Sequence, residues 1–123
     1  MKIAIQEDGR LPPMHYMVTE QQCSAALDWL RDNAAELGHA KARLVKAEHM
    51  VKHVEALEFQ RSDAKSAEAR KAEARTSAAY VDAINDAADA AGAYEALRAM
   101  REAAALKIEA WRTEQANFRS MKI

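Results

Sequence analysis

The chain has 123 residues, enough for one domain, and a formal net charge of −1. Twenty-nine residues are alanine and only seven are aromatic, so core-forming side chains are scarce and an elongated helical shape is favoured. The pI of about 6.4 lies well below the value of about 9 that is typical of nucleic-acid-binding domains. We expect neither a signal peptide nor a membrane span, because no apolar run approaches about 18 residues. A single cysteine, Cys23, excludes an internal disulfide framework, and we expect a cytoplasmic protein.

Residues 1–18 differ in composition from the rest of the chain. Residues 1–6 alternate as a short strand would, residues 7–10 have the composition of a turn, and residues 11–13 contain two prolines that favour an extended backbone. We therefore predict an N-terminal arm, extended or folded as a β-hairpin, held by docking or dimerisation because an isolated hairpin is marginal in water.

The helical domain, residues 19–123, begins with a predicted helix over residues 20–37. Thr19 and Gln22 have the spacing of a capping box. Gly38 then occupies the position at which a glycine commonly ends a helix. The predicted apolar stripe consists of Cys23, Ala26, Leu27, Leu30, Ala34 and Leu37.

Two further helices are predicted, over residues 39–62 and 77–120. The first carries Leu44, Val51, Val54 and Phe59, helped by Met50 and Leu57. The last has an apolar row at mostly helical or heptad spacing, consisting of Tyr80, Ile84, Ala87, Ala91, Tyr94, Leu97, Ala104, Trp111 and Phe118. Between Phe59 and Tyr80 the only hydrophobic residue is alanine, and Thr76 and Ser77 are the plausible N-cap pair. We place the reversal of the chain at residues 62–77.

The predicted fold class is all-α. The two longer helices form an elongated antiparallel hairpin or coiled coil, and the shorter third helix, residues 20–37, caps the aromatic end near Trp111 and Phe118. A helix of 44 residues is about 65 Å long and needs a partner along most of its length.

Charge is unevenly distributed along the chain. Residues 39–80 carry a net charge of +3, and residues 81–106 carry −3. This alternation suits helices that lie side by side, basic against acidic, within one molecule or between two copies. We expect self-association through the helices and a protein partner; nucleic acid is a further possible partner, and a membrane is not expected.

The candidate metal ligands are His49 and His53, which an i, i+4 spacing places on one helix face. No third ligand is convincingly placed, so two histidines on a charged helix are the preferred interpretation, and we predict no cofactor. Cys23 lies on an apolar stripe, where it packs as a small hydrophobic residue. No phosphate-binding loop or catalytic triad pattern is present, so we do not expect an enzyme.

Basic side chains form the candidate contact surface for DNA or a protein. Mixed charge around them favours the alternative that they are part of an ordinary solvated helix face. The candidates near the reversal and at the C-terminus are Arg61, Lys65, Arg70, Lys71, Arg75, Arg112 and Arg119.

Three sequence segments resemble small helical proteins of tailed phages and prophages. They are residues 77–80 (SAAY), 94–98 (YEALR) and 108–119 (IEAWRTEQANFR), within a region of similarity over residues 44–121. Genes of that kind lie near phage recombination or replication genes, and the resemblance therefore implies an accessory role in DNA handling in the host cytoplasm.

The leading hypothesis is a non-catalytic helical interaction protein that binds DNA or a DNA-processing protein. The alternatives are a structural homo-oligomeric coiled-coil protein and a phage inhibitor that occludes a host protein.

Overall fold

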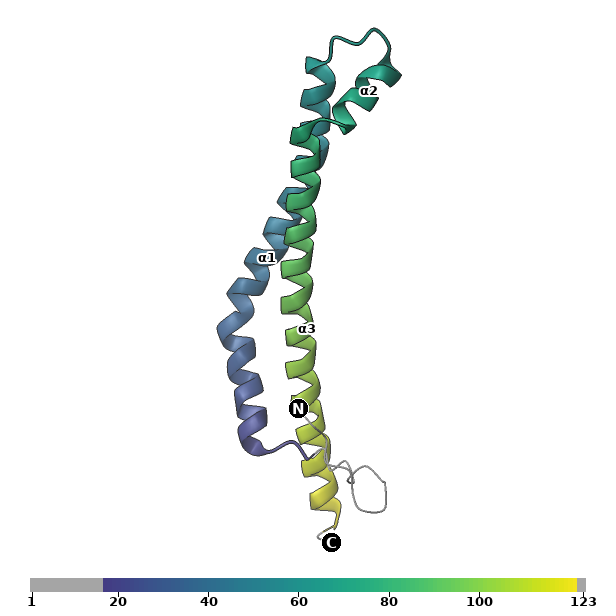
Figure 1. Ribbon diagram of the computed structural model, residues 1–123. Coiled ribbons are helices and arrows are strands. Elements are labelled where there is room, and N and C mark those ends of the chain that lie inside the picture. The colour runs from purple at the N-terminus through teal and green to yellow at the C-terminus, as the bar shows by residue number, and fades with distance from the viewer. Residues whose placement is uncertain (1–16, 122–123) are drawn as a thin grey trace, which may run out of the picture.

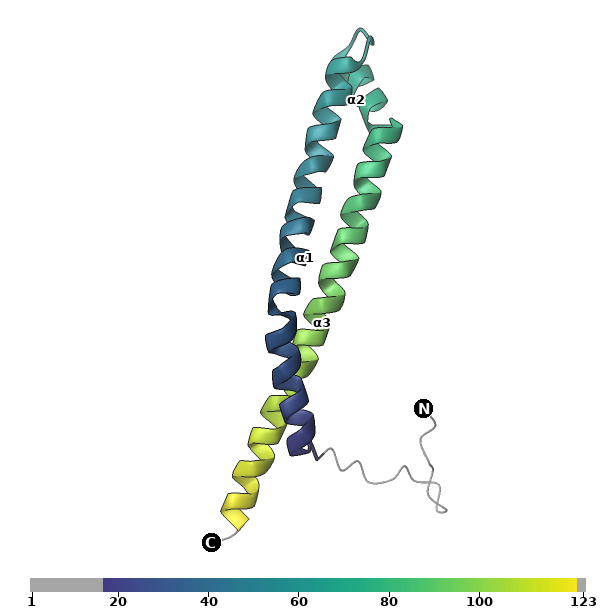
Figure 2. The same ribbon diagram turned by 90° about the vertical axis from the view of Figure 1, so that its left-hand side faces the viewer.

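The computed structural model describes residues 17–121, which form three helices and no strand. Two long helices, α1 (Glu20–Arg61) and α3 (Ala78–Met121), are joined through the short helix α2 (Ala67–Arg75). Figures 1 and 2 show α1 and α3 side by side in opposite directions, with α2 at one end of the elongated molecule. The all-α prediction is confirmed. The arm predicted for residues 1–18 lies outside the described residues, apart from Met17 and Val18.

The start of α1 is determined by the predicted capping box. Thr19 Oγ1 accepts a hydrogen bond from the backbone N–H of Gln22 at 3.1 Å, and the Gln22 side chain accepts one from the backbone N–H of Thr19 at 2.9 Å. Just before the cap, the backbone N–H of Val18 donates to the Glu114 carboxylate at 3.0 Å. This bond joins the beginning of α1 to the last turns of α3.

The predicted helix end at Gly38 is wrong, because α1 continues through it without interruption. A glycine inside a helix costs only about 1 kcal/mol relative to alanine, and strong helix formers lie on both sides. The apolar row also keeps its phase across this position, from Leu37 to Ala40 and Leu44. Residues 20–37 are consequently not a separate helix that caps the aromatic end; they extend α1 along α3.

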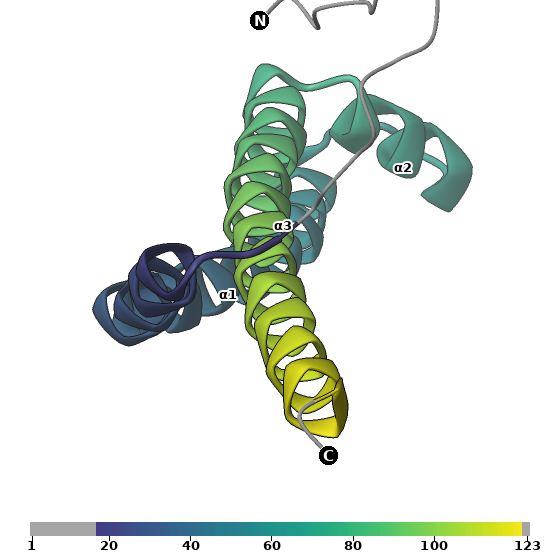
Figure 3. The same cartoon turned by 90° about the horizontal axis from the view of Figure 1, so that it is seen from below.

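The reversal falls within residues 62–77, and it contains a helix that the sequence analysis did not predict. Ser66 caps α2 by accepting a hydrogen bond from the Ala69 N–H at 3.0 Å. Thr76 ends α2, and the Ser77 hydroxyl accepts from the Tyr80 N–H at 3.2 Å at the start of α3. Seen from below, α2 projects to one side of the two long helices (Figure 3).

The contact between α1 and α3 is a seam with a seven-residue repeat. Buried and half-buried side chains recur at alternating steps of three and four residues on both helices, the spacing of helices that pack along their whole length. On α1 they are Cys23, Ala26, Leu30, Asn33, Leu37, Ala40, Leu44, Ala47, Val51, Val54 and Glu58. On α3 they are Tyr80, Ala83, Ala87, Ala90, Tyr94, Leu97, Ala104, Ile108, Trp111 and Gln115, with the exposed Arg101 at the one remaining position.

The seam buries very little apolar volume. Among the described residues, Leu44 is the only buried apolar side chain larger than cysteine or alanine, with 8% of its surface exposed. It packs with Ala47 and Ala90, and Tyr94 lies at the edge of this cluster. Several side chains that the sequence analysis assigned to the core lie outside it: Leu27 is 52% exposed, Ile84 43% and Phe118 42%.

Replacing Gly38 with alanine should stabilise the chain by up to about 1 kcal/mol, because alanine is the better residue inside a helix. An added Cβ would meet no atom within 4 Å at Gly38 or at Gly92, which lies within α3, so Gly92→Ala is the matched control. Urea denaturation followed by circular dichroism measures both. A loss of stability in Gly38→Ala alone would indicate that Gly38 ends a helix after all.

Leu44→Ala should lower the free energy of unfolding by about 2–3 kcal/mol, because it removes the one large side chain buried in the seam. Leu106→Ala is the control, since Leu106 is 69% exposed and should change stability by less than about 0.5 kcal/mol. Equal effects of the two substitutions would contradict the position of the core.

Candidate interaction surfaces

The tip of the molecule, residues 61–77, is tied to α1 by polar contacts. Ser62, 7% exposed, donates a hydrogen bond to Glu73 Oε2 at 2.8 Å and accepts one from the Ala64 N–H at 3.2 Å. The bond between Ser62 and Glu73 connects the end of α1 to α2 across the turn. The tip therefore has a defined conformation although alanine and charged residues make up most of it.

Arg70 belongs to the structure of the tip rather than to its free surface. Its Nε donates to the Ala64 carbonyl at 2.7 Å, and its guanidinium lies 6.0 Å from the centre of the Phe59 ring. The bond closes the loop between Ser62 and α2, and the ring contact adds a weak cation–π attraction. A predicted contact residue thus has a structural role.

The other predicted contact residues fall into two groups. Arg61, Arg75 and Arg112 pair with Glu58, Glu55 and Glu109 at 3.3, 3.1 and 3.8 Å. Their side chains are at least half exposed, so each pair contributes little and can exchange for another partner. Lys65, Lys71 and Arg119 form no ion pair with any residue in the described range 17–121.

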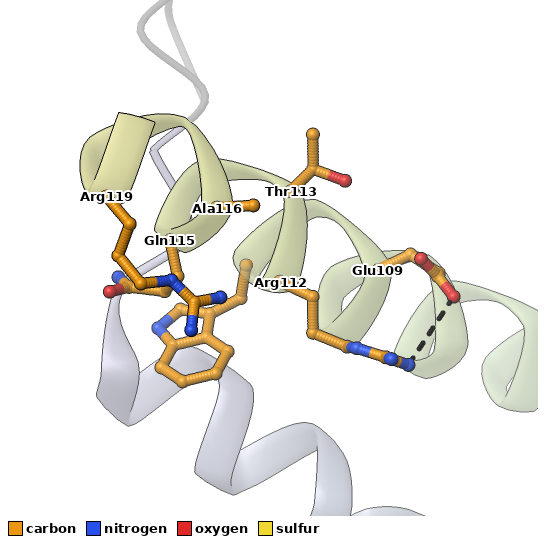
Figure 4. A pocket seen from close by; sticks show the side chains of 7 residues that line it. Glu109, Arg112, Thr113, Gln115, Ala116 and Arg119 are labelled. Atoms are coloured by element: carbon orange, nitrogen blue, oxygen red, sulfur yellow. Dashed lines mark ion pairs between the residues drawn. The ribbon is translucent and has the colours of Figure 1, made fainter. Parts of the chain in front are cut away.

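The structure places these residues at opposite ends of the molecule. The five candidates between 61 and 75 belong to the tip or its borders, whereas Arg112 and Arg119 lie near the far end of α3 (Figure 1). Around these last two, Figure 4 shows Thr113 and Arg119 projecting from different sides of one helix, with Glu109 and Arg112 paired. The seven candidates do not form a single basic surface.

The candidate metal ligands gain no third partner from the fold. His49 and His53 are both exposed on α1. Across residues 17–121, no group of three or more His, Cys, Asp or Glu side chains is arranged to hold a metal ion. Cys23 is a free thiol, 5% exposed, in the seam.

An ion pair between α1 and α3 identifies one side of the hairpin. Arg43 and Asp86 meet at 3.3 Å, and each directly precedes a seam position on its helix. Every seventh residue along either helix lies on the same side as these two. We call this surface the Met50 side; it comprises Trp29, Glu36, Arg43, Met50 and Leu57 of α1 and Ala79, Asp86, Ala93, Met100, Lys107 and Glu114 of α3.

The opposite side of the hairpin carries apolar and charged side chains in a similar proportion. We call it the Ile84 side; it comprises Leu27, Lys41, Val45 and Glu48 of α1 and Val81, Ile84, Ala91 and Arg98 of α3. The Lys41 ammonium lies 4.9 Å from the centre of the Tyr94 ring, and Arg98 pairs with Glu95 and Glu102 at 3.6 and 3.4 Å.

Both sides expose large apolar side chains that a monomer with one small core leaves in water. Met50 and Val45 are each 40% exposed, and Met100 and Leu27 are each 52% exposed. Exposed apolar side chains that gather along one side of a helix pair can mark interaction sites. Helical spacing alone assigns Met50 and Leu27 to apolar faces packed within the molecule, and only the phase of the seam shows that they lie beside it.

None of the described helices is both long and apolar enough to cross a membrane. The fold defines a class, a long antiparallel helix pair with a folded tip. No protein-family model, curated protein or solved structure matches the chain. The resemblance to small phage helical proteins stays a prediction.

Replacing Arg70 with alanine should loosen the tip, because it removes the bond to the Ala64 carbonyl and the contact with Phe59. Amide hydrogen exchange of residues 64–76 should become at least several-fold faster, while exchange in the middle of α1 stays unchanged. Lys71→Ala, one residue further on, is the control and should leave the tip unchanged. Equal exchange in both variants would exclude a structural role for Arg70.

Proposed function

We propose that the chain is a non-catalytic helical interaction protein, which acts by presenting the outer sides of the α1–α3 pair to another polypeptide. The observation that supports this proposal is the set of large apolar side chains beside the seam, with Met50, Met100 and Leu27 at 40–52% exposure. Covering them with a partner would remove apolar surface from water, at roughly 25 cal/mol per Å².

Protein is favoured over DNA as the partner by the state of the basic residues. At the tip, Arg70 bonds to the backbone, and Arg61 and Arg75 are paired with glutamates. Lys65 and Lys71 are then the two tip candidates without such partners among the described residues, and two phosphate contacts give only weak, salt-sensitive binding. The resemblance to phage helical proteins is the reason to seek the partner among DNA-processing proteins, or among host proteins that a phage inhibits.

A photo-crosslinking amino acid at Met50 or Met100 should form adducts with a protein in cells that produce the full chain, because both positions lie in apolar surface that the proposal assigns to a partner. His49 and Asn85 are control positions; both are exposed and lie on the outer faces of their helices, away from the seam. Mass spectrometry of the adducts identifies the partner.

The proposal predicts adducts of one or a few defined masses at Met50 and Met100, and few or none at His49 and Asn85. Equal labelling at all four positions, or no protein adduct at any of them, would contradict a role in protein interaction.

A further inference from the structure

The Met50 side combines apolar and charged residues in an order that fits a second copy of the same chain. We propose that two hairpins pack through their Met50 sides into a four-helix bundle with both tips at the same end. This inference rests on the proposed function, since it names the partner of that surface.

Charge is the first reason to choose a second copy. About one helical turn along the chain from the Arg43–Asp86 pair, and one step farther from the seam, the same side of the hairpin carries Lys46 on α1 and Asp82 and Asp89 on α3. These three side chains are exposed and form no ion pair within the described residues. Around Arg43 and Asp86 the surface is thus basic on α1 and acidic on α3, and each half of this zone is complementary to the other half in an identical molecule; Glu36, two turns away on α1, lies outside the zone.

The two-fold axis follows from this charge pattern. If the axis runs parallel to the helices, α1 of one copy lies on α3 of the other at the same height, and an interface of this kind is self-complementary. Arg43 then faces Asp86 and Asp89 of the second copy, and Lys46 faces Asp82 and Asp86. In the opposite orientation α1 would lie on α1 and α3 on α3, so these basic residues would no longer face the acidic residues of α3 in the second copy.

Side-chain size agrees with the same arrangement. The contacts of Arg43 with Asp86 and of Val18 with Glu114 set the register of the helices. In this register Trp29 is level with about residues 100–103 of α3, and Met50 with about residues 79–82. Trp29 would therefore meet Met100 and Ala103 of the second copy, and Met50 would meet Ala79, so Trp29 and Met50 each have an alanine opposite them.

The available area is sufficient for a stable dimer. From Trp29 to about Val51, the length over which α1 lies beside α3, the surface is about 33 Å long, and two helices make it about 20 Å wide. Each copy would bury about 700 Å², within the usual range of a specific protein interface.

Sedimentation equilibrium of the full chain tests the interface. The wild type should be a dimer at micromolar concentration, and the double variant Met50→Glu with Met100→Glu should dissociate at least about 100-fold more readily, because four carboxylates would enter the apolar parts of the bundle. The matched control, Val45→Glu with Leu27→Glu, alters residues of the same exposure, 40% and 52%, and should remain a dimer.

The orientation is tested without relying on those variants. The double variant Cys23→Ala with Lys65→Cys carries one spin label on the tip of each copy, and double electron–electron resonance measures the distance between the two labels. We expect a distance between the labels of less than about 40 Å. Tips at opposite ends would give more than about 60 Å, because each long helix spans about 65 Å.

A monomer at all concentrations, a dimer that the Met50 and Met100 substitutions leave intact, or widely separated tips would each overturn the inference. The proposed function would fail separately. If the chain is monomeric but the Met50 probe forms adducts with a different protein, the interaction role stands and the second copy is wrong; if no adduct forms, both are wrong.

Discussion

The rest of the structure depends on the narrow contact between α1 and α3. Alanine occupies many of the seam positions, including Ala47 and Ala90 beside Leu44. Small side chains let the two helices approach closely, but they remove little apolar surface from water. A long helix is not stable without packing along one face, and a core with one large buried side chain offers little compensation for the conformational entropy of about 100 ordered residues. This shortage accounts for both the polar contacts that hold the tip and the apolar residues exposed beside the seam.

Helical content and the position of the reversal could be predicted from the sequence, because they depend on local signals. The Thr19–Gln22 capping box and the proline-free stretch after it are examples. Gly38 misled the prediction because a glycine at a plausible helix end resembles one that a continuous helix tolerates. Helix α2 was missed because the bonds that support it join residues that come together only after folding. These are the hydrogen bonds from Ser62 to Glu73 and from Arg70 to Ala64.

The seam was harder to predict than the helices. In a chain with 29 alanines, alanine marks both buried and exposed positions, so a pattern built on large residues selected Leu27, Ile84 and Phe118, which are exposed. The repeat of three and four residues becomes visible only when the buried alanines and the half-buried Asn33 and Gln115 are included. The candidate contact residues were chosen by charge alone, and charge does not reveal which arginines are engaged within the molecule.

If the seam is too thin to hold a single copy, the stability of the chain must depend on association. The most direct test is the melting temperature of the full chain, followed by circular dichroism over a 100-fold range of protein concentration. The account predicts a rise of about 5–8 °C from the lowest to the highest concentration, because mass action stabilises an associated native state. A melting temperature that does not change with concentration would show that the seam alone stabilises the hairpin, and would contradict the account.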